Sequence, residues 1–206
     1  FYGAILTAVA ALVLVVARWN GRTIAASSAK VTASTGFLFV AYSADAMNAG
    51  TYGLLIVLGL LLGWLGDVFL LARRSKPLFL AGIISFLGGH IAYTCALVSV
   101  GVSWTLTATA LAFLFAIGVA FYRWVGSTVE LGLRRAVAAY IAVISCMLAA
   151  GVGTIGTPLA TCIVPGAALF YASDIGVGLD RFKDVRPPAY LWSLPIYYAG
   201  QLLFAW

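Results

Sequence analysis

The sequence contains little charge. Only 9% of its 206 residues are Asp, Glu, Lys or Arg, whereas about a quarter of an average soluble domain is charged. Hydrophobic residues make up 64% of the chain, and the mean hydropathy is +1.08. These values exclude an ordinary soluble domain and predict an integral membrane protein, with enough length for about seven or eight spans. We therefore expect one transmembrane domain over residues 1–206.

Cysteine and histidine are also scarce. The three cysteines, Cys95, Cys146 and Cys162, lie in apolar segments without paired spacing, so we expect them to be small apolar filler. His90 is the one histidine, which excludes a histidine-rich metal site. The sequence also lacks the GxSxG, HExxH and Walker motifs. These absences exclude the common soluble hydrolase, zinc peptidase and nucleotide-binding classes, and we expect no metal or organic cofactor.

Long apolar runs occupy most of the chain. Windows of about 20 apolar residues predict eight spans: 1–17, 23–44, 52–72, 77–99, 103–122, 135–153, 157–178 and 188–206. The first run has no basic start or cleavage site, so we interpret it as a span rather than a signal peptide. The second is the weakest, because it is rich in Ser and Thr and contains Lys30, and it is open to a tilted or re-entrant course. The expected fold is an all-α membrane bundle of eight transmembrane helices.

Basic residues occur in alternate connections. The basic residues that follow the odd-numbered spans are Arg18, Arg22, Arg73, Arg74, Lys76, Arg123, Arg134, Arg135, Arg181, Lys183 and Arg186. The connections 45–51, 100–102 and 154–156 contain no Lys or Arg. By the positive-inside rule the basic connections face the cytoplasm, and both termini lie on the non-cytoplasmic side. The net charge of +6 is then a topology signal that also suits anionic lipid headgroups, and it requires no nucleic-acid partner.

Three charged residues lie inside predicted spans. At 1.5 Å per residue, Asp67, Asp174 and Lys30 are each roughly 9–12 Å from the cytoplasmic end of their helix. Charges inside a membrane usually line a cavity or a pathway, so a common depth predicts a polar layer around one cavity.

Small residues indicate which way the two acids face. Gly59 and Gly63 recur at four-residue spacing with Asp67. Gly166, Phe170 and Gly178 recur in the same way with Asp174. Because glycine faces let helices approach closely, we expect both carboxylates to point into the bundle.

The layer has two interpretations. In the structural one, Lys30 and the acids form ion pairs and take part in no reaction. That accounts well for one Asp and less well for two, since one Lys cannot neutralise both. In the catalytic one, two close carboxylates do not both ionise easily, so one holds a proton and the other is a base. Such a pair can perform general acid–base hydrolysis.

Other polar residues accompany the layer. His90 is predicted roughly 20 Å from the cytoplasmic end of its helix, deeper than the acids, and Tyr93 shares its face. Tyr197, Tyr198 and Gln201 on the last span are expected at a similar depth, with Ser193 nearer the acids. These side chains either line the same cavity or form interhelical hydrogen bonds.

Two stretches resemble a known family. Residues 63–97, GWLGDVFLLARRSKPLFLAGIISFLGGHIAYTCAL, contain G-D-x-x-L-L, then F-x-x-G-x-x-S-F, then H-x-x-Y. Residues 164–182, VPGAALFYASDIGVGLDRF, contain S-D followed after six residues by R-F. These ordered motifs resemble the YhhN-like, or lysoplasmalogenase, family of multi-pass membrane proteins. The family also tends to have Lys-Pro in its second span, where this chain has Lys30 followed by Val31.

The resemblance implies an activity. Characterised animal members hydrolyse the vinyl ether bond of lysoplasmalogens to a fatty aldehyde and a glycerophospho-base. Two aspartates are implicated, and they correspond to Asp67 and Asp174. The implied partner is a membrane lysophospholipid substrate, and closeness to bacterial members favours a bacterial inner membrane with the acids toward the cytoplasmic leaflet.

The residues fit such chemistry. A carboxylic acid protonates the β-carbon of a vinyl ether, and water attacks the resulting oxocarbenium ion, as in glycoside hydrolysis. Because a hydroxyl at Ser173 would stabilise an ionised neighbour, we expect Asp174 to be the base and Asp67 the acid. Lys30, with Arg73, Arg74 or Arg181 above it, is expected to hold the phosphate. His90, Tyr93, Tyr197 and Tyr198 complete the expected substrate site.

Two other functions remain open at this stage. Intramembrane acids with a lysine are also typical of proton-coupled transporters. A structural or lipid-binding protein without turnover would use the same charges as ion pairs. Lipid cleavage, proton or solute flux in liposomes, and melting in detergent distinguish the three.

Overall fold

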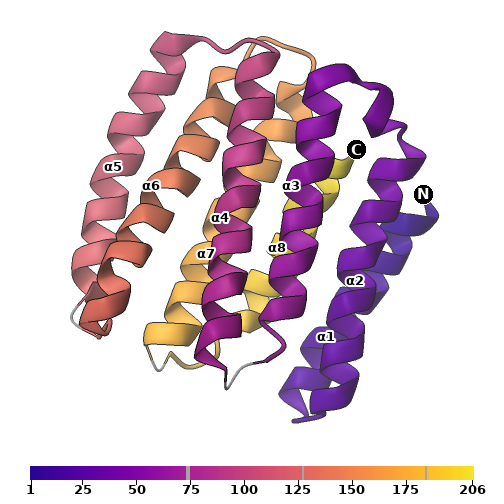
Figure 1. The fold of residues 1–206 in the computed structure, drawn as a ribbon, viewed down its shortest axis with the longest axis vertical. Coiled ribbons are helices and arrows are strands. Elements are labelled where there is room, and N and C mark those ends of the chain that lie inside the picture. The colour runs from indigo at the N-terminus through magenta and orange to yellow at the C-terminus, as the bar shows by residue number, and fades with distance from the viewer. Residues whose placement is uncertain (73–74, 127, 184) are drawn as a thin grey trace.

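The described part of the chain is helical. The computed structural model describes residues 1–72, 75–126, 128–183 and 185–206, and these contain no strand. The helices are α1 (Tyr2–Trp19), α2 (Thr23–Ser43), the 3₁₀ turn η1 (Ala46–Asn48), α3 (Gly50–Phe69), α4 (Lys76–Ser99), α5 (Trp104–Gly126), α6 (Leu131–Gly153), α7 (Ala160–Phe182) and α8 (Tyr190–Ala205) (Figure 1).

The eight predicted segments are confirmed as helices, with shifted ends. α6 begins at Leu131 rather than at residue 135, and α5 continues to Gly126 rather than ending at residue 122. Both differences add basic residues that lower hydropathy without interrupting backbone hydrogen bonding. α2 is one continuous helix despite its Ser and Thr content. Of the described helices, α1–α7 are long and apolar enough to cross a membrane, whereas α8 has 16 residues.

Helices adjacent in sequence pack as antiparallel pairs. The pairs are α1 with α2, α3 with α4, α5 with α6 and α7 with α8, and α8 also contacts α1, α2 and α3. The connections within these four pairs lie at the lower end of the bundle in Figure 1, and both chain ends lie toward the other end. The helix ends that carry the basic residues are therefore gathered at one end of the molecule.

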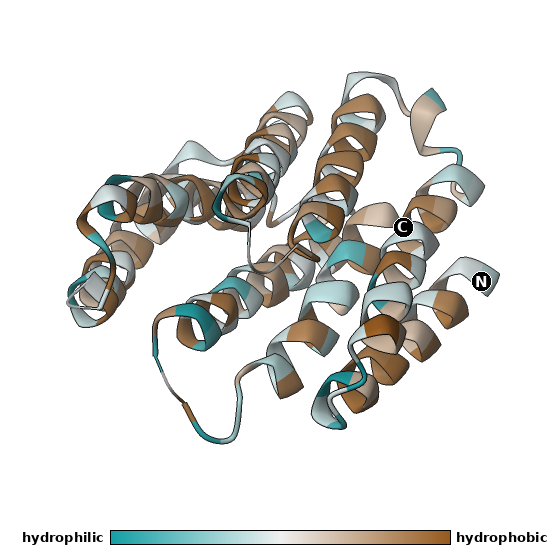
Figure 2. Ribbon diagram, turned by 60° about the horizontal axis from the view of Figure 1, so that its bottom comes forward, coloured by the Kyte–Doolittle hydropathy of each residue, from teal (hydrophilic) through white to brown (hydrophobic). Residues whose placement is uncertain are grey.

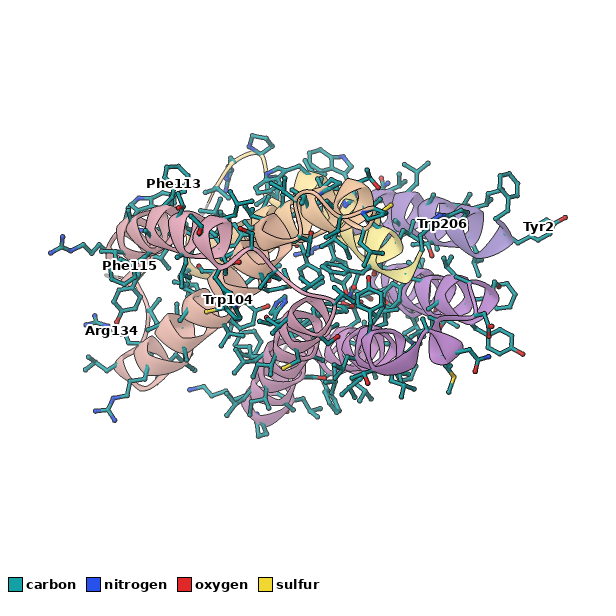
Figure 3. The ribbon with its side chains drawn as sticks, turned by 90° about the horizontal axis from the view of Figure 1, so that it is seen from above. Tyr2, Trp104, Phe113, Phe115, Arg134 and Trp206 are labelled. Atoms are coloured by element: carbon teal, nitrogen blue, oxygen red, sulfur yellow. The ribbon has the colours of Figure 1, made fainter. Side chains whose placement is uncertain are left out.

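The outside of the bundle is apolar. Side chains such as Phe113 and Phe115 project outward from α5 and are 68% and 69% exposed (Figure 3). Apolar residues cover most of the helical ribbon, and hydrophilic residues gather toward the connections (Figure 2). Large exposed apolar surfaces are costly in water, so this surface indicates contact with lipid. The protein is an integral membrane helix bundle.

Gly36 allows α1 and α2 to approach closely, and we predict that Gly36→Ala destabilises the bundle. A methyl group there would press on the Thr7 hydroxyl and lie 3.0 Å from Thr7 N and 3.1 Å from Gly3 O. Backbone atoms cannot move aside cheaply, so we expect a loss of about 1–3 kcal/mol. Gly132→Ala is the matched control, because nothing lies within 4 Å of its new methyl group. Thermal melting in detergent should show a lower midpoint only for Gly36→Ala; equal midpoints would contradict the prediction.

Candidate active site

Asp67 lies in a buried polar cluster where α2, α3 and α8 meet. Its Oδ1 is 3.0 Å from Nζ of Lys30, and its side chain is 3% exposed. Its Oδ2 accepts hydrogen bonds from the Ser34 hydroxyl and, at 2.9 Å, from the Tyr197 hydroxyl. The ion pair between Lys30 and Asp67 is therefore present, as the structural interpretation of the sequence requires.

The cluster continues through a chain of hydrogen bonds toward α4. Gln201 donates from Nε2 to the Tyr197 oxygen at 3.2 Å and accepts from the Tyr93 hydroxyl at 2.6 Å. The Tyr198 hydroxyl donates to the Lys30 carbonyl at 3.3 Å. Both carboxylate oxygens of Asp67 have partners. Such a saturated buried network stabilises helix packing and leaves little capacity to bind a ligand.

Asp174 lies in a second cluster, formed by α4, α6 and α7. Its Oδ2 is 3.1 Å from Nε2 of His90 and accepts a hydrogen bond of 2.9 Å from the Tyr140 hydroxyl. Nε2 of His90 is also 3.0 Å from the Tyr140 oxygen, and Nδ1 of the same ring is 3.3 Å from Sδ of Met147. His90 is fully buried, whereas the Asp174 side chain is 13% exposed.

Asp174 and Tyr140 line an apolar pocket between α4, α5, α6 and α7. The pocket has a volume of about 120 Å³. Its walls include Phe79, Ile83, Phe121, Ile141, Ile144 and Ile175. Arg181 also lines it, two turns from Asp174 on α7, with its guanidinium carbon 4.2 Å from the centre of the Phe79 ring. A pocket with apolar walls, one carboxyl group and one cation suits an anionic amphiphile.

The two carboxylates do not share this pocket. Asp174 lines it and Asp67 does not. Phe170 lies between the clusters, with its ring centre 4.7 Å from that of His90 and 5.2 Å from that of Tyr197. The expectation of one cavity around both acids is therefore not met in this conformation. A common depth along the helices does not specify which side of its helix each carboxylate faces.

His90 reaches Asp174 although the sequence placed it deeper than the acids. α4 begins and α7 ends at the same side of the bundle. Because Cα–Cβ bonds tilt toward the N-terminus of a helix, His90 leans toward that side and Asp174 leans away from it. The two leaning side chains meet between their Cα positions. Counting 1.5 Å per residue located the backbone but not these side-chain ends.

Ser173 does not contact the carboxyl group of Asp174. Its hydroxyl donates to the Phe170 carbonyl at 2.7 Å, within its own helix, and the side chain is buried. The reason for choosing Asp174 as the base is thereby lost. A residue adjacent in a helix points about 100° away, so sequence adjacency was a poor guide to this contact.

The other expected site residues are divided among the two clusters and the pocket. Tyr93, Tyr197 and Tyr198 belong to the network around Asp67, together with Lys30. Arg181 lines the pocket beside Asp174. Arg73 and Arg74 lie outside the described residues. Lys30 and Arg181 therefore do not form one phosphate site, because Lys30 binds Asp67 in the other cluster.

Tyr140 was missed by the sequence analysis. It lies six residues beyond Arg134 and five beyond Arg135, at roughly the depth predicted for the acids. The depth argument was applied to the charged residues, to His90 and to the last span, and extending it to the span that begins at residue 135 would have included Tyr140. Among the described residues, no group of three or more His, Cys, Asp or Glu side chains could hold a metal ion.

Comparison with known proteins identifies the family. A family model described as the YhhN family matches residues 25–206, which include both aspartates, His90 and Tyr140. No curated protein and no solved structure matches the chain. The family match agrees with the motifs around Asp67 and Asp174, and it covers all but the first helix. The chain belongs to the YhhN family.

Proposed function

We propose that this protein is an intramembrane hydrolase that cleaves the vinyl ether bond of lysoplasmalogens or related ether lysolipids. The YhhN family is known as the lysoplasmalogenase family, which supports a membrane hydrolase. The observation that carries the proposal is that Asp174 lines an apolar pocket which Arg181 also lines.

The proposed arrangement in the membrane has eight spans. α8, at 16 residues, is roughly 24 Å long and shorter than a typical hydrocarbon core of about 30 Å. It contacts α7, α1, α2 and α3, and eight of its 16 residues are buried, so the bundle supports it on one side. The basic connections then face the cytoplasm, both termini lie outside, and the pocket opens toward the cytoplasmic leaflet, in our proposal that of a bacterial inner membrane.

In the proposed reaction, Asp174 acts first as an acid and then as a base. Its carboxyl group gives a proton to the β-carbon of the vinyl ether, and the double-bond electrons form the new C–H bond, leaving an oxocarbenium ion. The Asp174 carboxylate then takes a proton from water as the water oxygen attacks the α-carbon. The carboxyl group formed in this way gives its proton to the ether oxygen and takes the hydroxyl proton of the hemiacetal, and the C–O bond breaks. The products are an aldehyde and an alcohol, with the carboxyl group regenerated.

The positions of Arg181 and Asp174 along α7 set the orientation of the substrate in the pocket. Arg181 and Asp174 are seven residues apart on α7, or roughly 10 Å along the helix. A phosphate at Arg181 and a vinyl ether at Asp174 are separated by a glycerol backbone, which spans a distance of this order. The first carbons of the chain would lie against Ile144 and Tyr171, one turn deeper.

Asp67 has a different part in this proposal. It is enclosed by Lys30, Ser34 and Tyr197 and does not line the pocket, so Asp174 takes both of the roles that the sequence divided between the two acids. Asp67 holds Tyr197, whose ring packs on Phe170, which in turn packs on His90. Asp67 therefore contributes to activity through the position of the Asp174 cluster rather than by proton transfer.

Proton-coupled transport is the alternative, and one feature of the structure disfavours it. A proton relay needs a continuous series of groups that can exchange protons. Between Tyr197 and His90 the contact is made by Phe170, which cannot carry a proton. The two clusters therefore do not form a relay in this conformation.

The experiment is a product assay with purified protein. It is incubated with a lysoplasmalogen and, separately, with the ester lysolipid of the same chain and headgroup, and products are identified by mass spectrometry. We expect free aldehyde from the vinyl ether and no fatty acid from the ester. Fatty acid release without aldehyde would overturn the reaction class. Proton or solute flux in liposomes without any cleavage would favour transport.

We predict that Arg181→Gln weakens substrate binding more than turnover. A charge-assisted hydrogen bond to phosphate is worth about 1.5–3 kcal/mol, so KM should rise about 10-fold or more while kcat changes little. Arg22→Gln is the matched control, since Arg22 is exposed in the connection between α1 and α2 and is remote from the pocket. Steady-state kinetics of aldehyde release measure both constants. A fall in kcat at unchanged KM would place the phosphate elsewhere.

A further inference from the structure

We propose that Tyr140 is a positioning residue which, together with His90, holds one oxygen of Asp174 so that the other oxygen faces the pocket. The inference rests on the proposed function for its catalytic meaning. Its structural part, the sharing of one carboxyl oxygen by a tyrosine and a histidine, can be tested without any substrate.

Three polar atoms from three helices form a triangle. The Tyr140 oxygen, Nε2 of His90 and Oδ2 of Asp174 are separated by 2.9, 3.0 and 3.1 Å. They come from α6, α4 and α7. The rings of His90 and Tyr140 also pack edge to face, at 5.4 Å between centres. This packing fixes the direction of both donors, because neither ring can rotate without losing it.

The surroundings of His90 indicate where its proton lies. Nδ1 faces the Met147 sulfur, which is a weak acceptor, whereas Nε2 faces two oxygens. The ring is fully buried and packs on Phe170. A proton on Nε2 therefore satisfies more acceptors than a proton on Nδ1. In this arrangement Nε2–H is shared between the oxygens of Asp174 and Tyr140. The Tyr140 hydroxyl in turn donates to Asp174.

The two oxygens of Asp174 consequently differ. Oδ2 accepts from both Tyr140 and His90, and Oδ1 accepts no hydrogen bond from the described residues. Asp174 is partly exposed and lines the pocket, so Oδ1 is the oxygen left for a ligand. When the carboxyl group is protonated, two donors already occupy Oδ2, and the proton resides on Oδ1. Tyr140 and His90 thus turn the acidic oxygen toward the pocket, where the β-carbon of the vinyl ether takes up the proton.

The first test uses the single histidine of the chain. In protein labelled with ¹⁵N only at histidine, both ring signals belong to His90 without further assignment. We expect one protonated and one unprotonated nitrogen in the wild-type protein, with Nε2 the protonated one. Tyr140→Phe and Asp174→Asn should each shift the Nε2 signal more than the Nδ1 signal. Tyr52→Phe on α3 is the matched control, a half-buried tyrosine outside the pocket, and should shift neither.

The second test is kinetic. Tyr140→Phe removes one oxygen and retains the ring that lines the pocket, so kcat for aldehyde release should fall about tenfold, corresponding to one lost hydrogen bond, while KM changes little. Tyr52→Phe should leave both constants unchanged. A structural role alone would lower the melting temperature without this split between kcat and KM.

The outcomes separate this inference from the proposed function. If the wild-type protein releases no aldehyde, the proposed hydrolase function is overturned. The NMR result still tests whether Tyr140 and His90 share one oxygen of Asp174. Full kcat in Tyr140→Phe overturns the positioning role and leaves the hydrolase intact. A wild-type spectrum with Nε2 unprotonated overturns the arrangement even if Tyr140→Phe does not fold.

Discussion

Asp174→Asn is expected to lower the rate of aldehyde release at least about 100-fold, because general acid catalysis by a positioned group contributes about 10²–10⁴ in rate. The amide is close in size to the carboxyl group and still accepts at its oxygen from Tyr140 and His90, so the cluster should persist. It cannot, however, give a proton to the β-carbon of the vinyl ether. Substrate binding should survive, since the pocket and Arg181 are unchanged.

Mass spectrometry of the aldehyde measures the rate, and melting in detergent shows whether the variant is folded. Glu130→Gln is the matched control, because it also converts a carboxyl group into an amide, at an exposed position before α6. It should keep the wild-type rate. Turnover near the wild-type level in folded Asp174→Asn would remove Asp174 from the chemistry and with it the proposed mechanism.

Lys30→Met is expected to destabilise the bundle by about 3–5 kcal/mol, the usual result of removing one partner from a buried ion pair. It would leave the Asp67 carboxylate uncompensated at a site where the side chain is only 3% exposed. Asp67→Asn should lower the free energy of unfolding by less than Lys30→Met does. The Lys30 side chain is 16% exposed, and its flexible stem can move the ammonium group toward water. The double variant Lys30→Met/Asp67→Asn removes both charges from this site and should recover much of the lost stability.

Chemical or thermal unfolding of the four proteins gives the comparison. Lys76→Met is the matched control, since Lys76 pairs with Glu130 on the surface at 3.9 Å and such pairs contribute little. If the loss of stability in the double variant equals the sum of the losses in the two single variants, Lys30 and Asp67 are not energetically coupled, which would contradict the prediction. A double variant that melts like the wild type yet releases no aldehyde would show that the pair serves activity and not only stability, as the family resemblance implies for Asp67.

The positions of the helices and of the basic residues could be predicted from the sequence. Apolar run length located all eight segments, and the basic residues correctly grouped the four connections that lie at one end of the bundle. Depth along the helix also selected Asp67, Asp174 and Lys30, and the ion pair between Lys30 and Asp67 is present. Run length, charge and depth each depend on one segment at a time, whereas the ion pair joins two helices.

The contacts among the site residues could not be predicted from the sequence. Tyr140 is 34 residues from Asp174, and His90 is 84 residues away, so no local pattern connects them. Ser173, adjacent to Asp174, points elsewhere. Tyr197 is 130 residues from Asp67, and Phe170 separates the two clusters although it shares a helix face with Asp174. Proximity in sequence was a poor guide because neighbouring helical residues diverge by about 100°.

By itself the sequence determined that this chain lies in a membrane, which segments form helices and which ends of those helices carry the positive charge. These properties follow from the transfer free energy of each residue and the rise of a helix, which need no knowledge of neighbours. Only the tertiary structure decided that Asp174 meets the pocket while Asp67 is enclosed by Lys30, Ser34 and Tyr197. The physical reason is that rotation and lean of each helix, set by packing between distant segments, choose the atoms that a side chain faces.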